Sequence, residues 1–369
     1  MLCLDVVNVT SAPSCSSSNV TSLTSVTEVY VIKVIIALLI TFLINVLNIV
    51  NLIILRRMVS INNTVKNLMI SMSVSDLLLG IFVCLPGIIS ALLHFWPFAS
   101  IFCQITGFIN GMSIGVSSWC MTCISIERYL VVVRPLGLQY RQRSWILRLI
   151  LALIWTTNSA TFVLPMLVNE KWTYYKYDDV TFMCGFEWDP YWMIYVALLL
   201  YQLCPAVVSS ICSVGIIHSL RINLRVAPST SRVTPPLESS LDTLRNSDIM
   251  EVHSEGIANV KTIRHNVSII QPRNILVELK LKKEAKVTKV LMLTQTAFFI
   301  CTMPYVITSM VQVTQSIVIT SFNVFIISWF LNCNSFINVF IYSLTYQEFR
   351  TIFKTFKLVQ QIRNVLRRH

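Results

Sequence analysis

Apolar residues gather into seven long runs along the chain, with polar intervals between them. Each run exceeds the roughly 20 residues that an α-helix needs to cross the hydrocarbon core of a bilayer. The runs cover residues 29–55, 67–93, 103–133, 145–167, 191–217, 290–312 and 316–343. The pattern therefore predicts seven membrane-spanning helices, called spans one to seven in chain order.

A shorter amphipathic pattern follows span seven. Its apolar positions recur at helical spacing, with basic residues on the other side: Phe349, Ile352, Phe353 and Phe356 against Arg350, Lys354 and Lys357. A helix of this kind lies flat in the membrane interface, with its apolar face toward the lipid. The expected fold class is an all-α membrane protein, a seven-transmembrane helix bundle with an amphipathic eighth helix.

The same pattern divides the chain into three parts. We expect an extracellular N-terminal tail over residues 1–28, the bundle over 29–343, and the eighth helix with a cytoplasmic tail over 344–369. The longest polar interval, at about 222–280 within the bundle, is rich in Ser, Thr and Arg. It has no core-forming pattern, which is typical of a disordered loop.

The amino-acid composition also indicates a membrane protein. Of 369 residues, 55% are hydrophobic and 12% are charged, and the mean hydropathy is +0.68. Ordinary soluble domains carry about 25% charged residues. The spans occupy about half of the chain. No sizeable soluble catalytic domain remains, so the chain is not expected to be an enzyme.

Basic residues fall mainly on one side of the predicted spans. Only Lys33, Lys171 and Lys176 lie on the side of the N-terminus. The other side carries Arg56, Arg57, Lys66, Arg134, Arg141, Arg143, Arg148, the cluster Lys280, Lys282, Lys283 and Lys286, and the tail from Arg350 to Arg368. Because Lys and Arg accumulate in cytoplasmic loops, we expect a plasma-membrane protein with its N-terminus outside and its C-terminus inside. This rule and attraction to anionic lipid of the bilayer explain the net charge of +12, so nucleic acid is not an expected partner.

The exterior segments carry sites for covalent chemistry. Asn8 and Asn19 each begin an Asn-x-Thr sequon on the exterior tail, where glycosylation is expected. Cys103 and Cys184 fall at exterior ends of segments, in an oxidising compartment. A disulfide between them would tie span three to the second outer loop.

Asp76 lies in the middle of span two, with no basic residue at its depth. A charge there costs roughly 2.5–3.5 kcal/mol unless it finds a partner or water. The candidate partners are the other intramembrane polar groups Asn48, Ser117, Asn334, Ser335 and Asn338. Two interpretations stay open: a hydrogen-bonded network that only holds helices together, or a polar centre that also binds a cation such as Na⁺. No other cofactor is expected.

The cytoplasmic end of span three reads Glu127-Arg128-Tyr129. An arginine at this depth needs an anion, which adjacent Glu127 can supply. Glu284, at the inner entry of span six, can supply a second one across the bundle. Two alternative partners would allow a switch that releases span six. On local chemistry alone, a simple charged triplet at the membrane interface is the competing interpretation.

These features combine into a resemblance that covers residues 29 to 357. The marks are Asn48, Asp76, Pro86, Trp96-Pro97-Phe98 before Cys103, Glu127-Arg128-Tyr129, Trp155, Pro165, Pro205, Phe298 to Pro304, and Asn334 to Tyr342. In this order and spacing, the sequence resembles a rhodopsin-family (class A) G-protein-coupled receptor.

The resemblance implies a receptor that passes an extracellular signal to a heterotrimeric G protein by outward movement of span six. The residues it implies for G-protein coupling are Glu127, Arg128, Tyr129, Pro135, Leu136, Glu284 and Tyr342. Arrestin and receptor kinases are further expected partners, with sites in the Ser-rich and Thr-rich loop from Ser229 to Ser247.

Three positions depart from the family pattern. Span six carries a switch region of Phe298, Thr302 and Pro304, in which Thr302 stands where the family usually has Trp. Val339 replaces the usual proline of span seven, and Ser213 stands where span five usually offers Tyr. A small hydroxyl cannot act as a bulky rotamer switch, so ordinary dependence on an agonist is in doubt.

The ligand class is narrowed by exclusion. Asn110 stands where amine receptors of this family have Asp, and Asn332 stands where the light-sensing members have the retinal lysine. A biogenic amine is therefore disfavoured and a visual pigment is excluded. The residues expected to line a cleft for an extracellular ligand are Asn110, Ile114, Tyr305, Ser328 and Asn332; plain interhelical packing is the alternative for them.

The second outer loop combines aromatic and acidic residues between Tyr177 and Trp188. Aromatics there could fold into the cleft and occupy it, or the loop could be a solvated lid. In the overall character of its sequence, the chain resembles a small orphan subgroup with high basal signalling toward adenylyl cyclase. The alternatives to a signalling receptor are a receptor-like scaffold and, with less support, a transporter, since no repeated halves are visible.

Overall fold

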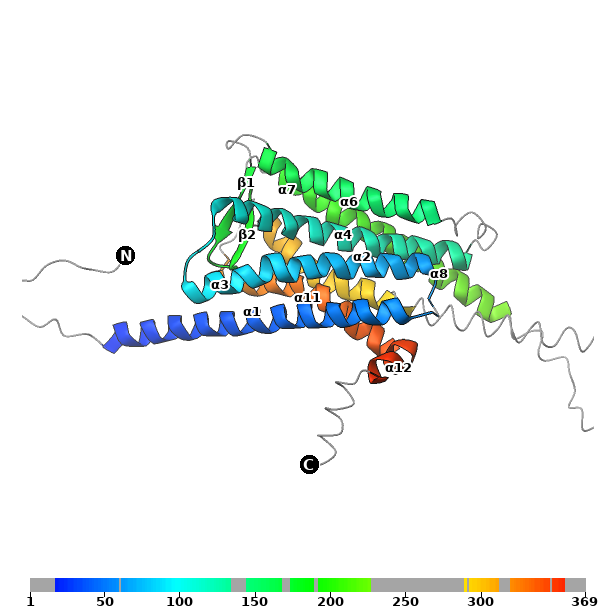
Figure 1. The fold of residues 1–369 in the computed structure, drawn as a ribbon, viewed down its shortest axis with the longest axis horizontal. Coiled ribbons are helices and arrows are strands. Elements are labelled where there is room, and N and C mark those ends of the chain that lie inside the picture. The colour runs from blue at the N-terminus through cyan, green and yellow to red at the C-terminus, as the bar shows by residue number, and fades with distance from the viewer. Residues whose placement is uncertain are drawn as a thin grey trace, which may run out of the picture.

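The computed structural model describes residues 17–59, 61–133, 144–167, 173–188, 192–226, 289–290, 292–311, 319–345 and 347–355. They form a bundle of long helices that run roughly side by side, with a short β hairpin at one end (Figure 1). The helix α12 leaves the bundle at the opposite end and turns away from the bundle axis (Figure 1).

The elements, in chain order, have the following bounds. They are α1 (Ser17–Arg57), α2 (Asn63–Leu79), η1 (Gly80–Cys84), α3 (Leu85–Leu93), α4 (Ser100–Val133), α6 (Ser144–Leu167), β1 (Thr173–Asp178), β2 (Met183–Trp188), α7 (Trp192–Leu198), η3 (Leu199–Leu203), α8 (Cys204–Val226), α11 (Ser321–Thr345) and α12 (Gln347–Thr355). Residues 292–311 are also helical and are called the 292–311 helix.

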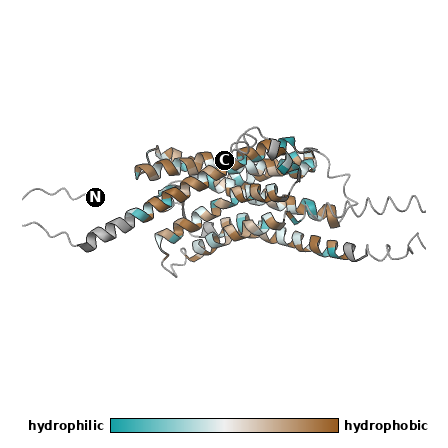
Figure 2. Ribbon diagram, turned by 90° about the horizontal axis from the view of Figure 1, so that it is seen from below, coloured by the Kyte–Doolittle hydropathy of each residue, from teal (hydrophilic) through white to brown (hydrophobic). Residues whose placement is uncertain are grey.

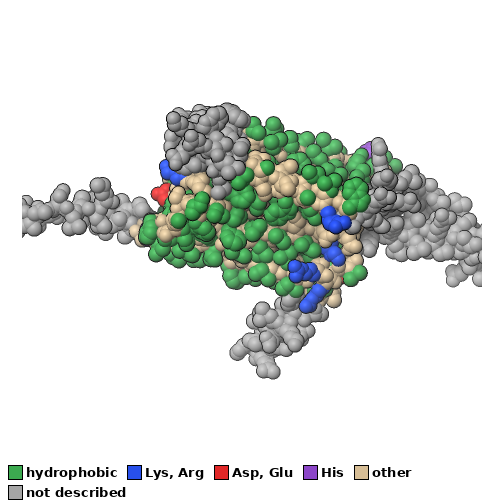
Figure 3. Space-filling model, turned by 45° about the horizontal axis from the view of Figure 1, so that its top comes forward, with side chains coloured by type: hydrophobic (Ala, Val, Ile, Leu, Met, Phe, Trp, Pro, Cys, Tyr) green, Lys and Arg blue, Asp and Glu red, His purple; other side chains and the backbone are tan. Residues whose placement is uncertain are grey.

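Within the described residues, six helices are long and apolar enough to cross a membrane. The 292–311 helix coincides with the predicted span six. Hydrophobic residues run along the helices (Figure 2) and form a broad band on the face shown in Figure 3. Lys and Arg gather on that face toward the end of the bundle that carries α12 (Figure 3). The protein is a multi-pass membrane protein.

The helix α1 begins at Ser17, ahead of the expected domain boundary at residue 29, whereas its candidate membrane-spanning part is Thr27–Arg57. Hydropathy marks where the hydrocarbon begins, whereas a helix can continue into water through Ser and Thr residues that carry no apolar signal. Asn19 therefore lies in the first turn of α1, and Asn8 lies outside the described residues.

Within the part of the chain that the structure describes, two of the spanning helices contain a π-turn that the hydrophobic pattern did not predict. In span two, η1 separates α2 from α3, and in span five, η3 separates α7 from α8. A π-turn takes one extra residue into the helix and rotates everything beyond it, and such turns are frequent at functional sites. Both lie in the half of the bundle that carries the hairpin (Figure 1).

The predicted eighth helix is present as α12. Phe349 is fully buried against the bundle, whereas Phe353 is exposed. The carboxylate of Glu348 accepts a hydrogen bond of 2.9 Å from the backbone N–H of Val59, which joins α12 to the turn after α1. The helix is therefore docked at the inner end of the bundle. Phe356 lies outside the described residues.

Candidate functional site

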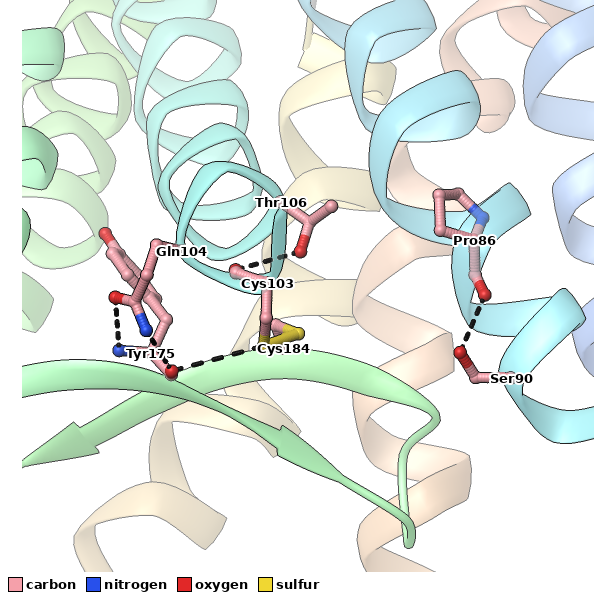
Figure 4. The surroundings of a disulfide bond; sticks show 7 residues. All are labelled: Pro86, Ser90, Cys103, Gln104, Thr106, Tyr175 and Cys184. Atoms are coloured by element: carbon pink, nitrogen blue, oxygen red, sulfur yellow. Dashed lines mark hydrogen bonds between the residues drawn. A yellow bond between two sulfur atoms is a disulfide. The ribbon is translucent and has the colours of Figure 1, made fainter. Parts of the chain in front are cut away.

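The second outer loop forms an antiparallel hairpin that is fastened to α4 at two adjacent positions. Strands β1 and β2 pair from Thr173 with Trp188 to Asp178 with Met183. Cys103 and Cys184 form the expected disulfide (Figure 4). Next to it, the side chain of Gln104 donates to the backbone carbonyl of Tyr175 at 2.6 Å and accepts from its N–H at 3.1 Å (Figure 4). Gln104 thus pairs with β1 as a neighbouring strand would.

The hairpin turn is built by Asp178. Its carboxylate accepts from the N–H of Val180 at 3.0 Å and from the hydroxyl of Thr181 at 2.7 Å, and its carbonyl accepts from the N–H of Phe182 at 2.9 Å. Phe182 has a φ of 62°, which a non-glycine residue rarely adopts. Strain of this kind persists only where the surroundings fix it.

The tip of the hairpin is fixed between α1, α3 and α11. The side chain of Phe182 is fully buried and makes edge contacts with Tyr30 and Phe325, at ring distances of 5.5 and 5.6 Å. The indole N–H of Trp329 donates to the carbonyl of Thr181 at 2.9 Å. A Cβ at Gly87 would collide with the carbonyl oxygen of Phe182, so only glycine lets the tip approach α3 this closely.

A buried lysine completes this contact. Lys33 of α1 lies over the ring of Phe325, with 5.2 Å from Nζ to the ring centroid. It is 8% exposed and interacts electrostatically with Asp178 and Asp179 of the turn. Phe182 of the loop therefore folds inward on the side of α1 and α11, whereas Phe186 packs against Phe162 of α6.

Beside the tip lies a cavity of about 690 Å³, called the cleft cavity. All five residues expected to line a ligand cleft lie on its wall: Asn110, Ile114, Tyr305, Ser328 and Asn332. The hairpin contributes residues from Lys176 to Phe186 to the same wall. Helix residues that the sequence did not single out include Phe162, Tyr201 and Gln202. Its volume is within the range of small-molecule sites.

Below the cleft cavity lies a smaller cavity of about 10 Å³, called the polar chamber. Asp76, Ser117, Asn334 and Ser335 line it, and its wall shares Ile114, Leu331 and Asn332 with the cleft cavity. By the same measure, roughly 10–15 Å³ holds one water molecule. The two cavities are therefore separated by a floor of three shared residues.

The hydrogen bonds at the chamber join α4 to α2 and α1 to α11. Ser117 donates to Oδ1 of Asp76 at 3.0 Å and lies 2.9 Å from the hydroxyl of Ser75. Ser335 lies beside the carboxylate, yet Oδ2 of Asp76 is buried and receives no hydrogen bond of normal geometry. Asn48 donates to the backbone carbonyl of Ser335 at 3.0 Å.

Asn338 is less clearly part of the polar network around Asp76. Its side chain is buried, but neither amide atom has a hydrogen-bond partner among the described residues, and it does not line the chamber. The amide oxygen of Asn334 also lacks a partner there. The structure thus joins Asn48, Asp76, Ser117 and Ser335, with Asn334 on the wall.

At the inner end of α4, Glu127 and Arg128 are 9% and 6% exposed. Glu127 accepts a hydrogen bond of 3.3 Å from Asn62, whose side-chain oxygen caps α2 by accepting from the N–H of Thr64. No pattern in the sequence predicts this link between α2 and α4. The ring of Tyr129 packs where a Cβ of Gly215 would lie, so α8 leaves space for it.

The remaining predicted residues divide into two groups. Tyr342 and Thr302 are fully buried, Phe298 is 3% exposed and lines the polar chamber, and Pro304 is half-buried. Helix α11 continues without interruption through Val339, as expected without a proline. Pro135, Leu136 and Glu284 lie outside the described residues.

Comparison with known proteins gives the same picture over most of the chain. A sequence model of the family described as "7 transmembrane receptor (rhodopsin family)" matches residues 47–342. The human "Probable G-protein coupled receptor 21" is 32% identical over 134 residues, which cover 36% of this chain and 38% of the relative. The mouse "G-protein coupled receptor 52" is 29% identical over 135 residues, 36% of each chain. The chain thus aligns with little more than a third of the length of these curated relatives.

The fold has a counterpart among solved structures. The crystal structure of squid rhodopsin superposes with a TM-score of 0.69 at 16% sequence identity, covering 89% of this chain and 85% of that one. The arrangement of helices is therefore the seven-helix bundle that the hydrophobic pattern predicted.

Proposed function

Because the chain belongs to the rhodopsin family of seven-transmembrane receptors, we propose that it carries a signal from the extracellular side to a heterotrimeric G protein. One observation carries the proposal. Helix α4 lines the cleft cavity with Asn110 and Ile114 and ends at the opposite end of the bundle in buried Glu127 and Arg128. With 34 residues it is about 50 Å long, so a single rigid element connects the two sites.

Activation moves the inner end of the 292–311 helix outward. Arg128 leaves Glu284, and the opening at the inner end of α4 admits the C-terminal helix of a G-protein α subunit. Pro135 and Leu136 provide a loop contact, and Tyr342 supports the open state. A ligand or loop shifts this balance only by its preference for one state, and a change from 1:99 to 99:1 requires roughly 5.5 kcal/mol.

We expect high basal signalling toward adenylyl cyclase. The hairpin lines the cleft cavity, and its tip is held beside that cavity among α1, α3 and α11 by Phe182 in an unusual backbone conformation. A chain segment that is tethered in the site has a high effective concentration there. Thr302 in place of the usual bulky switch residue lowers the barrier that such a segment has to overcome.

The polar chamber suits a sodium ion. Asp76 supplies a carboxylate oxygen without a hydrogen bond of normal geometry, and the hydroxyls of Ser113, Ser117 and Ser335 and the amide oxygen of Asn334 lie on the same wall. Oxygen ligands of this kind are preferred by hard cations. A bound ion would neutralise the buried carboxylate and tie α2, α4 and α11 together.

The receptor lies in the plasma membrane with the hairpin outside. Exposed basic residues, including Arg56, Arg57 and Arg350, are at the end with α12, which supports a cytoplasmic location for that end. Arrestin and receptor kinases would act at the same end, on the loop from Ser229 to Ser247 and around Arg128.

The decisive experiment measures cyclic AMP and G-protein dissociation without added ligand, for the wild type and for Arg128→Ala at matched surface expression. We expect a basal signal above that of mock-transfected cells that is lost in the variant. Signalling that is unaffected by Arg128→Ala would contradict the proposed coupling mechanism.

A non-signalling scaffold is the second candidate. It is favoured by one observation, the joint departure of Ser213, Thr302 and Val339 from the family pattern. Absence of any signal across G-protein classes, with normal surface expression, would support the scaffold.

A further inference from the structure

Gln202 has an unmet hydrogen-bonding capacity on the wall of the cleft cavity. It lies in the π-turn η3 and is 6% exposed, and its side-chain oxygen Oε1 has no hydrogen-bond partner among the residues that the structure describes. Buried amide oxygens are almost always paired, so this one calls for a donor. Oε1 is covered in this structure, so a donor that enters the cavity meets it when the side-chain amide rotates toward the cavity that Gln202 lines.

An aromatic surface lies next to Gln202. The rings of Phe162 and Tyr201 are 5.1 Å apart, and Phe162 is 5.7 Å from Phe186 of the hairpin. All three residues line the cleft cavity. The hydroxyl of Tyr201 is already engaged with Thr161. The wall around Gln202 thus favours a flat apolar group over a second polar one.

The charged residues on the described wall all come from the hairpin: Lys176, Asp178 and Asp179. The carboxylate of Asp178 is used within the turn, and Lys33 interacts electrostatically with both acids. Opposite charges therefore lie together at the mouth. Burial raises the pKa of Tyr177, also on this wall, to about 12, so its phenol is neutral at physiological pH.

The deeper wall, as far as the structure describes it, consists of uncharged polar and apolar residues. Asn110, Thr308, Ser309, Ser328 and Asn332 are its polar members besides Gln202. A charged ligand would lose its hydration there without meeting an opposite charge. A neutral ligand loses much less and can use the amides and hydroxyls as partners.

We propose that the cleft cavity binds a small, uncharged aromatic molecule that donates an N–H or O–H group to Oε1 of Gln202 while its ring packs against Phe162 and Tyr201. The inference rests on the proposed receptor function and names the class of ligand for the same cleft. It makes Gln202, rather than a carboxylate, the residue that orients the ligand.

The test uses three probes that share an indole ring and differ in charge: indole-3-acetamide, tryptamine and indole-3-acetate. Binding to the purified full-length protein is followed by its thermal stability over a concentration series of each probe. We expect stabilisation by the neutral amide, and little or none by the cation or the anion.

Two variants of Gln202 test its role. Gln202→Leu removes one neutral hydrogen bond and should weaken binding of the amide about tenfold. Gln202→Glu places a carboxylate at the same point and should turn the preference toward tryptamine, which a merely structural role would not do. Gln295→Leu is the matched control, because Gln295 is also buried with an unpartnered Oε1 but lies outside the cleft cavity.

The proposal is overturned if no probe stabilises the protein, if all three do so equally, or if Gln202→Leu binds the amide as well as the wild type does. Cyclic AMP measured in cells separates this result from the fate of the proposed function. Binding that depends on Gln202, in a protein without any signal above that of mock-transfected cells, would leave the ligand class standing and contradict the receptor role. Signalling that is lost in Arg128→Ala, without selective binding of the amide, would support the receptor role and contradict the proposed ligand class.

Discussion

Gly87 determines how closely the hairpin can approach α3. In Gly87→Ala the new Cβ would collide with the carbonyl of Phe182, and neither backbone can move without disturbing the turn or the helix. Overpacking of this kind costs about 1–3 kcal/mol, although alanine alone would favour the helix. We expect a lower melting temperature and greater protease sensitivity of the hairpin.

Gly185→Ala is the control for this prediction, since no described residue other than its two chain neighbours lies within 4 Å of the position where its Cβ would be placed. The two variants make the same chemical change in the same docked region. Equal melting temperatures for the two would show that the hairpin tip does not rest on α3 as described.

Gln104 joins α4 to the hairpin through both atoms of its amide. Gln104→Leu leaves the N–H and carbonyl of Tyr175 without these partners, which costs about 1–3 kcal/mol where the groups stay buried. We expect faster hydrogen exchange of the β1 amides while the disulfide stays intact. Ile105→Ala changes the next position, which is exposed, and should leave the hydrogen exchange of the β1 amides unchanged. If the β1 amides stay protected from exchange in Gln104→Leu, the disulfide alone holds the strand.

Sequence reasoning located some residues of the site and missed others. Asp76 was found because a polar group in an apolar run demands a partner or a cavity, whereas Asn110 and Asn332 were singled out through the family resemblance, as positions where other members carry a charged residue. Gln202 meets the same criterion and was missed, because the helical period cannot show that the π-turn η3 directs it to the cavity. Lys33 was assigned only to a side of the membrane, and its contact with Phe325 depends on tertiary packing.

At the scale of elements, Asn62 does two things for α2 and α4. It caps α2 and donates to Glu127, and substitution can separate these roles. Asn62→Ser keeps a capping oxygen and loses the reach to Glu127, whereas Asn62→Asp keeps the cap and places a second carboxylate beside it. Asn62→Ala loses both contacts, and loss of the cap alone costs about 1 kcal/mol.

We therefore expect melting temperatures in the order wild type, Asn62→Ser, Asn62→Asp, with Asn62→Ala also below Asn62→Ser. Because Asn62 is exposed, the repulsion in Asn62→Asp is weak and should shrink at high salt. An Asn62→Asp protein as stable as the wild type would mean that Glu127 does not depend on this contact.

The helices could be predicted from the sequence where they cross the membrane. Spans two to four appear as helices close to the expected bounds because a bilayer allows no other backbone for a long apolar run. The start of α1 at Ser17 and the hairpin were not predictable in this way, since both lie in water. Strand pairing in a loop depends on contacts with α4 and α11 that have no counterpart in local periodicity.

On the scale of the whole molecule, the two cavities follow one another along α4 toward buried Glu127 and Arg128. Ile114, Leu331 and Asn332 separate the cleft cavity from the polar chamber, so a ligand that moves this floor also changes the surroundings of Asp76. The sequence suggested both sites but could not show that they share a wall. That arrangement depends on how α4 and α11 pack.

The polar chamber offers the last prediction. If sodium binds the folded protein and not the unfolded chain, a concentration five times its Kd stabilises the fold by roughly 1 kcal/mol, which corresponds to a melting-temperature rise of a few degrees. We expect a higher melting temperature in NaCl than in choline chloride at the same ionic strength, which removes general salt effects. Asp76→Asn keeps the size of the side chain and removes the charge, so the difference should disappear. A sodium effect that persists in Asp76→Asn would place the ion elsewhere, and no effect in the wild type would make the chamber a site for water alone.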